Sequence, residues 1–180
     1  MSKLYGIKEI KQFNEKEYLS FISEIKKQID FATLVSDSNQ YNRVFNIVKD
    51  AEMKKHFAQP VQILYFDKSN LVSFHINCLA KGSFTNLNWN TDNRFSTFIP
   101  KSAINVDSLA ITLNEYSNIY NEINTNSDKQ YTILIFWTLA LKKVSNTAIE
   151  TVIENLNKFG KAAETDLYLI NTDKWFVGKF

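Results

Sequence analysis

The sequence contains few of the residues from which catalytic and cofactor sites are usually built. Its 180 residues include one cysteine, two histidines, four glycines and two prolines. The lone Cys78 excludes an intrachain disulfide and every zinc motif that uses several cysteines. No Walker loop, glycine-rich dinucleotide motif or nucleophile elbow is present, which argues against a nucleotide phosphate site. We therefore predict no cofactor and no metal ion.

Concentrated charge and long apolar runs are also absent. The chain carries 21 Lys and Arg against 19 Asp and Glu, a formal net charge of +2, and its lysines are spread along the sequence. Nucleic-acid-binding proteins usually gather basic charge on one face. No apolar run reaches the ~18 residues of a membrane span, and the first residues lack the apolar core of a secretory signal. Together with the single cysteine, this predicts a cytoplasmic protein with no nucleic-acid or membrane partner.

The sequence does have ample material for a hydrophobic core. Hydrophobic residues make up 44% of the chain and aromatic residues 14%, with 14 Phe and 8 Tyr. A chain of this length suits one domain. We predict a single domain over residues 1–180, made of a helical part at 1–59, an antiparallel β-meander at 60–100 and an α-β-α-β part at 101–180. The abundance of Asn, Lys and Ile suggests an AT-rich, bacterial genome and does not bear on function.

The hydrophobic period changes near Pro60. Before it, apolar residues recur at spacings of three and four, which predicts a first helix capped by Asn14 and Glu17 and a second helix over Tyr41–Phe57. After it the period is two, which predicts a hairpin and then two shorter strands, all antiparallel. The four predicted strands cover residues 61–66, 71–79, 84–90 and 94–99.

The last third of the chain has the pattern of a helix followed by a βαβ unit. The helix is predicted to begin at Asn105 or Asp107, and the unit consists of the strand Tyr131–Trp137, a helix from Ser145 or Thr147 and a strand over Leu167–Ile170. Gly160 is well placed to end that helix. A right-handed crossover makes the two strands parallel. The predicted fold class is α+β (mixed α/β), with one mixed sheet and helices packed on it; a meander that abuts a small α/β unit is the alternative.

His75 and Cys78 come closest to a catalytic pair. They differ by three positions, so strand alternation places them on opposite faces, and we predict a structural cysteine and a surface or partly buried histidine rather than a catalytic pair. Aromatic side chains that could anchor a partner follow at Trp89 and Trp175, with packing in the core as the alternative. No catalytic residue is predicted. The candidate binding residues are His75, Asn77, Trp89 and Trp175.

Residues 130–173 resemble the central βαβ unit of the thioredoxin-like fold. The first strand ends in Phe136-Trp137, and the second ends at Asn171-Thr172-Asp173. The resemblance implies a Cys-x-x-Cys motif in the loop after the first strand, but the corresponding positions hold Leu141 and Val144. It also implies a cis-proline and a closing β-hairpin after the unit, and this chain has no proline after residue 100. The implied protein is therefore a degenerate, redox-inactive member of that fold.

The leading hypothesis for function is a non-enzymatic cytoplasmic domain whose partner is another protein, such as an adaptor, an assembly component or an immunity-type protein. It rests on the missing catalytic motifs, the many aromatic residues and the near-neutral charge. Two alternatives stay open. One is a small-ligand-binding or enzymatic domain with a site assembled from scattered residues such as Asp67, His75, Asn77 and Asp173, and the other is a redox-inactive thioredoxin-like protein. The oligomeric state has no signature in the sequence.

Overall fold

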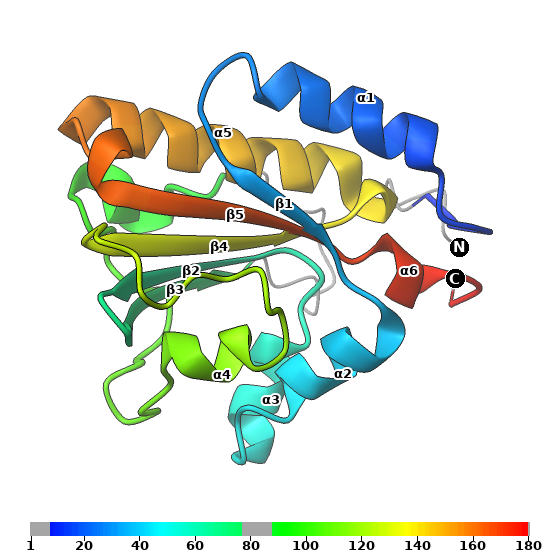
Figure 1. Cartoon of the computed structure of the whole chain (residues 1–180). Coiled ribbons are helices and arrows are strands. Elements are labelled where there is room, and N and C mark those ends of the chain that lie inside the picture. The colour runs from blue at the N-terminus through cyan, green and yellow to red at the C-terminus, as the bar shows by residue number, and fades with distance from the viewer. Residues whose placement is uncertain (1–7, 77–87, 180) are drawn as a thin grey trace.

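A mixed β-sheet organises the computed structural model, which describes residues 8–76 and 88–179 (Figure 1). Within these residues the sheet has five strands in the order β1-β5-β4-β2-β3, and helices pack on both of its faces. This confirms the predicted α+β class with one mixed sheet. The strands are β1 (Ala32–Val35), β2 (Gln62–Asp67), β3 (Asn70–Ile76), β4 (Tyr131–Trp137) and β5 (Thr165–Asn171).

The central strand β4 pairs with β5 on one side and with β2 on the other. The β4–β5 pair is parallel, with Ile135 opposite Leu169, as predicted for a strand–helix–strand crossover. The β4–β2 pair is antiparallel, and so is the predicted hairpin of β2 and β3. Strand β1 adds to β5 in parallel and forms one edge of the sheet.

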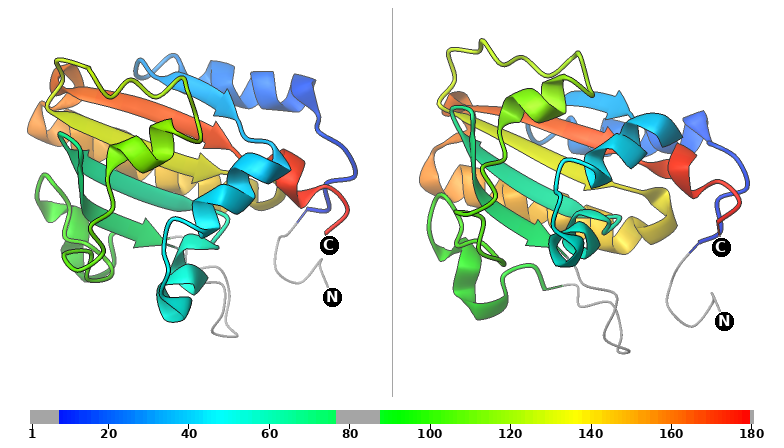
Figure 2. Two further views of the ribbon diagram at one scale, coloured as in Figure 1. Left: turned by 60° about the horizontal axis from the view of Figure 1, so that its bottom comes forward. Right: turned by 90° about the horizontal axis from the view of Figure 1, so that it is seen from below.

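The helices form a layer on each face of this sheet. In Figures 1 and 2, α1 and α5 lie over one face, and α2, α3 and α4 lie under the other. The short α6 continues directly from β5. The α-helices are α1 (Glu15–Ile25), α2 (Ser38–Phe45), α3 (Ala51–Phe57), α4 (Leu113–Ser117), α5 (Lys142–Phe159) and α6 (Asp173–Phe176), and the 3-10 helices include η2 (Thr91–Ser96), η3 (Leu139–Leu141) and η4 (Ala162–Glu164).

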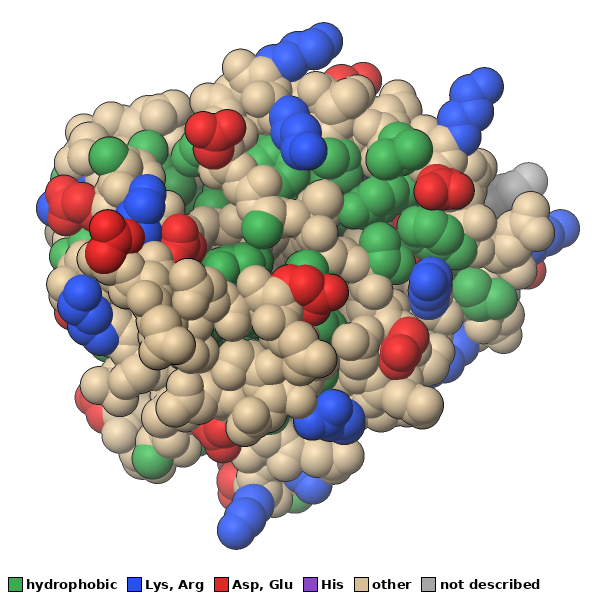
Figure 3. Space-filling view, in the orientation of Figure 1, with side chains coloured by type: hydrophobic (Ala, Val, Ile, Leu, Met, Phe, Trp, Pro, Cys, Tyr) green, Lys and Arg blue, Asp and Glu red, His purple; other side chains and the backbone are tan. Residues whose placement is uncertain are grey.

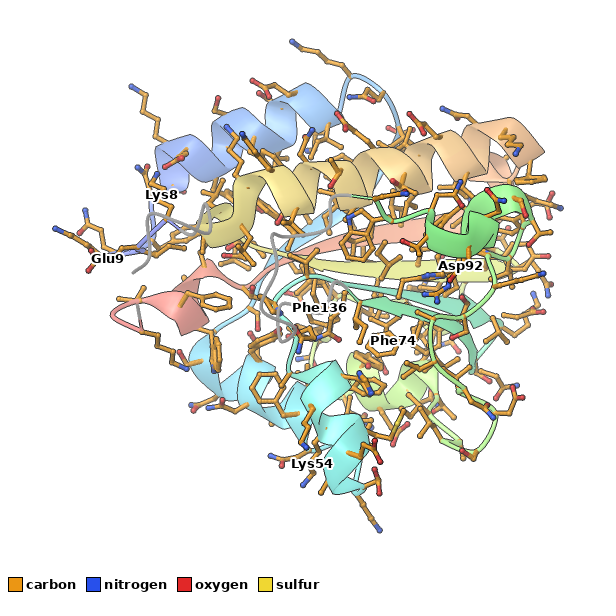
Figure 4. The ribbon with its side chains drawn as sticks, turned by 180° about the vertical axis from the view of Figure 1, so that it is seen from behind. Lys8, Glu9, Lys54, Phe74, Asp92 and Phe136 are labelled. Atoms are coloured by element: carbon orange, nitrogen blue, oxygen red, sulfur yellow. The ribbon has the colours of Figure 1, made fainter. Side chains whose placement is uncertain are left out.

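The core is divided in two by the sheet. Ile133 and Ile135 of β4 pack toward α1 and α5, whereas Leu134 and Phe136 pack toward α2, α3 and α4. Figure 4 shows Phe136 and Phe74 between the sheet and α3. Because both faces are covered, β4 is apolar at nearly every position instead of alternating. No helix in the described part of the chain is both long and apolar enough to cross a lipid bilayer.

Local capping explains where several helices begin and end. Asn14 caps α1 as predicted, by accepting a hydrogen bond from the N–H of Glu17, but the Glu17 carboxylate accepts from Lys8 and does not complete the predicted capping box. Helix α5 begins at Lys142, earlier than the predicted Ser145 or Thr147, because the aliphatic loop before it folds into the buried 3-10 turn η3. The helix ends as predicted at Gly160, which adopts the left-handed conformation with φ of 64°.

The prediction of one continuous helix over Tyr41–Phe57 is wrong. The helix predicted to begin at Asn105 or Asp107 is also much shorter than expected. The first is split into α2 and α3, because Asp50 accepts hydrogen bonds from the N–H groups of Glu52 and Met53 and so starts a new helix. The second is only the short α4, which begins after the capping residue Thr112. In both cases a polar side chain that caps a helix breaks the helical structure, although the helical spacing of apolar residues continues past that position in the sequence.

Two strand assignments also differ from the sequence prediction. Residues 94–99 are not a strand, because Arg94 to Ser96 belong to the 3-10 helix η2 and the residues after it form bends. The same helix holds Asp92 and Asn93 in left-handed conformations, with φ angles of 58° and 55°. Of the predicted strand over residues 84–90, the positions before Asn88 lie outside the described residues, and Trp89 and Asn90 form a turn rather than a strand. In contrast, β1 was not predicted at all.

The left-handed conformation of Gly160 gives a direct test of the end of α5. We expect Gly160→Ala to lower the free energy of unfolding by about 1 kcal/mol, because a Cβ atom is disfavoured at positive φ. An added Cβ would meet no atom within 4 Å, so the loss reports backbone conformation rather than a clash. Gly160→Asn should lose less, because Asn tolerates this conformation. Urea denaturation measures both, and an Ala variant as stable as the wild type would contradict this assignment.

Candidate functional site

The outer edge of β1 is the part of the sheet that remains open. No described strand pairs with it (Figure 1). The N–H of Ser36 donates to the carbonyl of Asn171 at 2.8 Å, so the backbone groups of Ser36 face β5. Because these groups alternate along a strand, the N–H and C=O groups of Thr33 and Val35 point away from the sheet. These are the donors and acceptors that an additional strand would use.

The opposite edge of the sheet is covered by residues 102–112. The N–H of Leu71 in β3 donates to the carbonyl of Ile111 at 3.0 Å, and the N–H of Ala103 donates to the carbonyl of Phe74 at 2.9 Å. The N–H of Phe74 in turn donates to the hydroxyl of Ser102. The outward backbone groups of Leu71 and Phe74 are therefore paired, whereas β1 has no strand on its outer side within the described residues.

The side chains of β1 do not protect this edge. Proteins usually guard edge strands with lysine, proline or a bulge, and Ala32–Val35 contains none of these. Ala32 is exposed, and Thr33 is held toward α1 by a 2.6 Å hydrogen bond between its hydroxyl and that of Tyr18. Figure 3 shows hydrophobic side chains gathered on this side of the molecule, between α1 and α6. The exposed Asp30 and Asp37 stand just before and after the strand.

A hollow of about 610 Å³ lies where β1 and β5 begin. Ile29, Phe31 and Ala32 line one side of it, and Ala162 and Ala163 of η4 line another. Lys26, Asp30 and Asp166 add charged groups to its wall. The hollow is therefore continuous with the open edge and has room for a side chain that a docked strand would carry.

His75 is buried, and the prediction that it is a surface or partly buried residue is wrong. Its ring lies 4.6 Å from that of Phe95, and its Nε2 atom is 2.9 Å from the hydroxyl of Ser73. Burial, with a smaller effect of the positive charge of Arg94, lowers the pKa of His75 to about 3. The imidazole is therefore neutral near pH 7. The pairing of β2 and β3 shifts at a bulge near Val72, which is 38% exposed. His75 lies opposite Ile63 on the face that α1 and α5 cover, so it is buried although the strand alternates as predicted.

The other predicted binding residues are not brought together into one site. Asn77, like Cys78, lies outside the described residues. Trp89 is buried on the α1 and α5 side of the sheet, where Phe95 also packs. Trp175 packs on the other face, and its indole N–H donates to the side-chain oxygen of Asn42 at 2.9 Å. The sheet thus separates Trp175 from His75 and Trp89.

Asp173 is buried and accepts a set of hydrogen bonds that the sequence did not predict. One of its oxygens accepts hydrogen bonds from the Thr138 hydroxyl at 2.6 Å and the Leu139 N–H at 2.7 Å. The other accepts from the side-chain amide of Asn171 at 3.1 Å. Burial raises the pKa of Asp173, and these hydrogen bonds oppose that shift. The carboxylate ties the ends of β4 and β5 to the start of α6.

The scattered residues proposed for an enzymatic site do not converge. Asp67 stands opposite Tyr131 at the start of β4 and is hydrogen-bonded by Gln130, whereas Asp173 contacts Thr138 beyond the end of the same strand. A strand of this length separates them by roughly 20 Å. Among the residues that the structure describes, no group of three or more His, Cys, Asp or Glu side chains is placed to hold a metal ion.

Comparison with known proteins gives no further guide to the site: no family model, no curated protein and no solved structure matches this chain.

The buried state of His75 predicts a loss of stability in mild acid. The unfolded chain binds a proton at His75 near its ordinary pKa of 6.5, but the folded chain does so only near 3, so stability falls as the pH drops below 6.5. Between pH 7.5 and pH 5 this costs about 2 kcal/mol.

Denaturant unfolding at these two pH values measures that loss. A His75→Gln variant should be less stable at pH 7.5 but should lack this part of the pH dependence. His56→Gln is the control, because it retains His75 and should retain the loss. Equal pH profiles for the wild type and His75→Gln would contradict the assignment.

Proposed function

We propose that this chain is a non-enzymatic protein-interaction domain that binds an extended segment of another protein along β1. The observation that carries the proposal is the open edge of Ala32–Val35, which lacks the usual protective residues while the edge of β3 is covered. A partner strand would extend the sheet by main-chain hydrogen bonds to Thr33 and Val35. Adaptor, assembly and immunity roles in the cytoplasm all fit this mode of binding.

The geometry also indicates what kind of segment would fit. Strand β1 has only four residues, so its backbone offers few hydrogen bonds, each worth about 0.5–1.5 kcal/mol. Further affinity would come from one side chain placed in the hollow next to Phe31 and Ala32. Asp30 and Asp37 favour basic residues at both ends of the partner strand. The preferred segment is therefore short, apolar or β-branched in its middle and basic at its ends.

The state of the chemically capable residues supports a binding role over an enzymatic one. His75 is neutral and enclosed, and the carboxylate of Asp173 is occupied by three hydrogen bonds from the protein itself. The loop after β4 contributes the buried side chains of Leu139 and Leu141. Each of these side chains therefore contributes to the stability of the folded structure.

A redox-inactive thioredoxin-like scaffold is a second proposal, at the level of fold. The parallel β4–α5–β5 unit supports it, because antiparallel pairing of β4 and β5 would have excluded it. The hairpin of β2 and β3 lies beside β4 in the sheet, but the chain forms it before the βαβ unit rather than after it. Such a scaffold is compatible with a binding role at β1.

Placing a lysine on the open edge tests the proposed function. Peptides that bind the wild-type protein would be selected from a display library of short random sequences. We expect Ala32→Lys to weaken the selected peptides by roughly tenfold, which corresponds to about 1.4 kcal/mol, because a charged side chain opposes strand addition. Val72→Lys is the matched control, since Val72 is an exposed apolar residue on the other edge strand. Titration calorimetry measures both affinities.

Amide hydrogen exchange then shows whether binding uses the backbone of β1. We expect the N–H groups of Thr33 and Val35 to exchange rapidly in the free protein and to become protected in the complex. The N–H of Ser36, which already bonds to Asn171, should be slow in both states. Peptides that leave Thr33 and Val35 unprotected, and that bind Ala32→Lys as well as the wild type, would overturn the proposal.

A further inference from the structure

The open edge of β1 has an apolar side, which faces α1. Phe31 and Val35 pack against the core on the α1 and α5 side of the sheet, whereas Leu34 belongs to the core on the other side. Thr33, between Phe31 and Val35, faces α1 as well, through its hydrogen bond to Tyr18. Phe31 and Val35 are only partly buried, so both leave apolar surface beside the edge.

Leu19 of α1 extends this apolar side. It is 55% exposed, more than any other large hydrophobic residue that the structure describes. Leu19 and Lys26 are seven positions apart, so they lie on the same side of the helix. The ammonium of Lys26 lies 6.0 Å from the centre of the Phe31 ring, which places that side of α1 next to β1. Leu19, Phe31 and Val35 thus form an apolar strip along the α1 side of the edge.

The opposite side of the edge is polar. The segment over residues 118–126 covers the sheet there, and the hydroxyls of Tyr120 and Ser36 are 2.8 Å apart at one end of β1. At the other end, the N–H of Asn124 donates at 3.0 Å to the hydroxyl of Tyr168, which stands opposite Ala32. In Figure 3 hydrophobic side chains gather on the α1 side of β1, and few lie on the opposite side. The exposed residues of the segment are Asn118, Asn121, Glu122, Asn124, Thr125 and Asn126.

From this difference we infer that β1 selects an amphipathic strand, in which apolar side chains alternate with polar ones. The inference rests on the proposed binding along β1 and states which partner strand fits there. Successive side chains of a docked strand point to opposite faces of the extended sheet. Those on the α1 side would cover the apolar strip, and those on the other side would meet the polar segment.

The two sides also exclude the simplest alternative, a strand that is apolar at every position. Such a strand would place half of its apolar side chains beside Asn121, Glu122 and Asn124, where they gain little from burial. Alternation is the pattern of a strand that is apolar on one face and solvated on the other. Leu19 determines this preference, because it supplies the most exposed apolar surface of the strip without belonging to β1.

The experiment compares peptides selected from a display library of short random sequences on the wild-type chain and on Leu19→Gln. We expect peptides selected on the wild type to carry apolar residues at alternate positions. Leu19→Gln changes an exposed helical residue to another good helix former, so it should fold normally but lose this preference. Val72→Gln is the matched control, because it also replaces an exposed apolar residue and should give the wild-type pattern.

Titration calorimetry with synthetic peptides then measures the preference. We expect an alternating peptide to bind the wild type about fivefold more tightly than a peptide of the same composition with its apolar residues grouped, and Leu19→Gln to abolish the difference. Selected peptides that Ala32→Lys weakens, but that lack alternation or ignore Leu19→Gln, would overturn this inference and leave binding at β1 standing. A selection that yields no peptide, or only peptides that bind Ala32→Lys as well as the wild type, would overturn both.

Discussion

The burial of β4 on both faces is the constraint on which the rest of the structure depends. Its residues Thr132 to Trp137 are all buried, so helices must cover the sheet on each side. The α1 and α5 layer and the α2, α3 and α4 layer meet this requirement. Because neither face of the sheet is free, a partner cannot stack directly on the sheet, and the backbone of β1 is where it could extend it.

The hydrogen bonds around Asp173 fix the ends of the two central parallel strands. The carboxylate contacts Thr138 and Leu139 after β4 and Asn171 at the end of β5. In many open α/β sheets, ligands bind beyond the carboxyl ends of parallel strands. Here that region holds a network whose members bond to one another and to the start of α6. The ends of these strands are thus part of the scaffold.

Strong local patterns made part of this fold predictable. The strand Tyr131–Trp137 was predicted with the bounds the structure gives, since a continuous apolar run flanked by polar residues has few other solutions. The strand predicted over residues 94–99 was wrong because its first residues complete the 3-10 helix η2, which alternation of apolar residues does not reveal. His75 was misplaced because alternation says nothing about burial when both faces of a sheet are covered. Strand β1 could not be predicted from the sequence, because four residues are too few to show a hydrophobic period and the strand it pairs with, β5, lies far along the chain.

The position of β1 also has a consequence for how the protein is made. Thr33 contacts Leu169, a residue 136 positions later, so the strand is synthesised early but meets its neighbour only after β5 has emerged from the ribosome. Contacts between such distant residues form late, because the intervening chain must be ordered first. During translation Ala32–Val35 is thus an unpaired segment on both of its sides, and β1 is completed among the last parts of the sheet. Until β5 is available, an unpaired stretch of this kind is exposed to pairing with other strands.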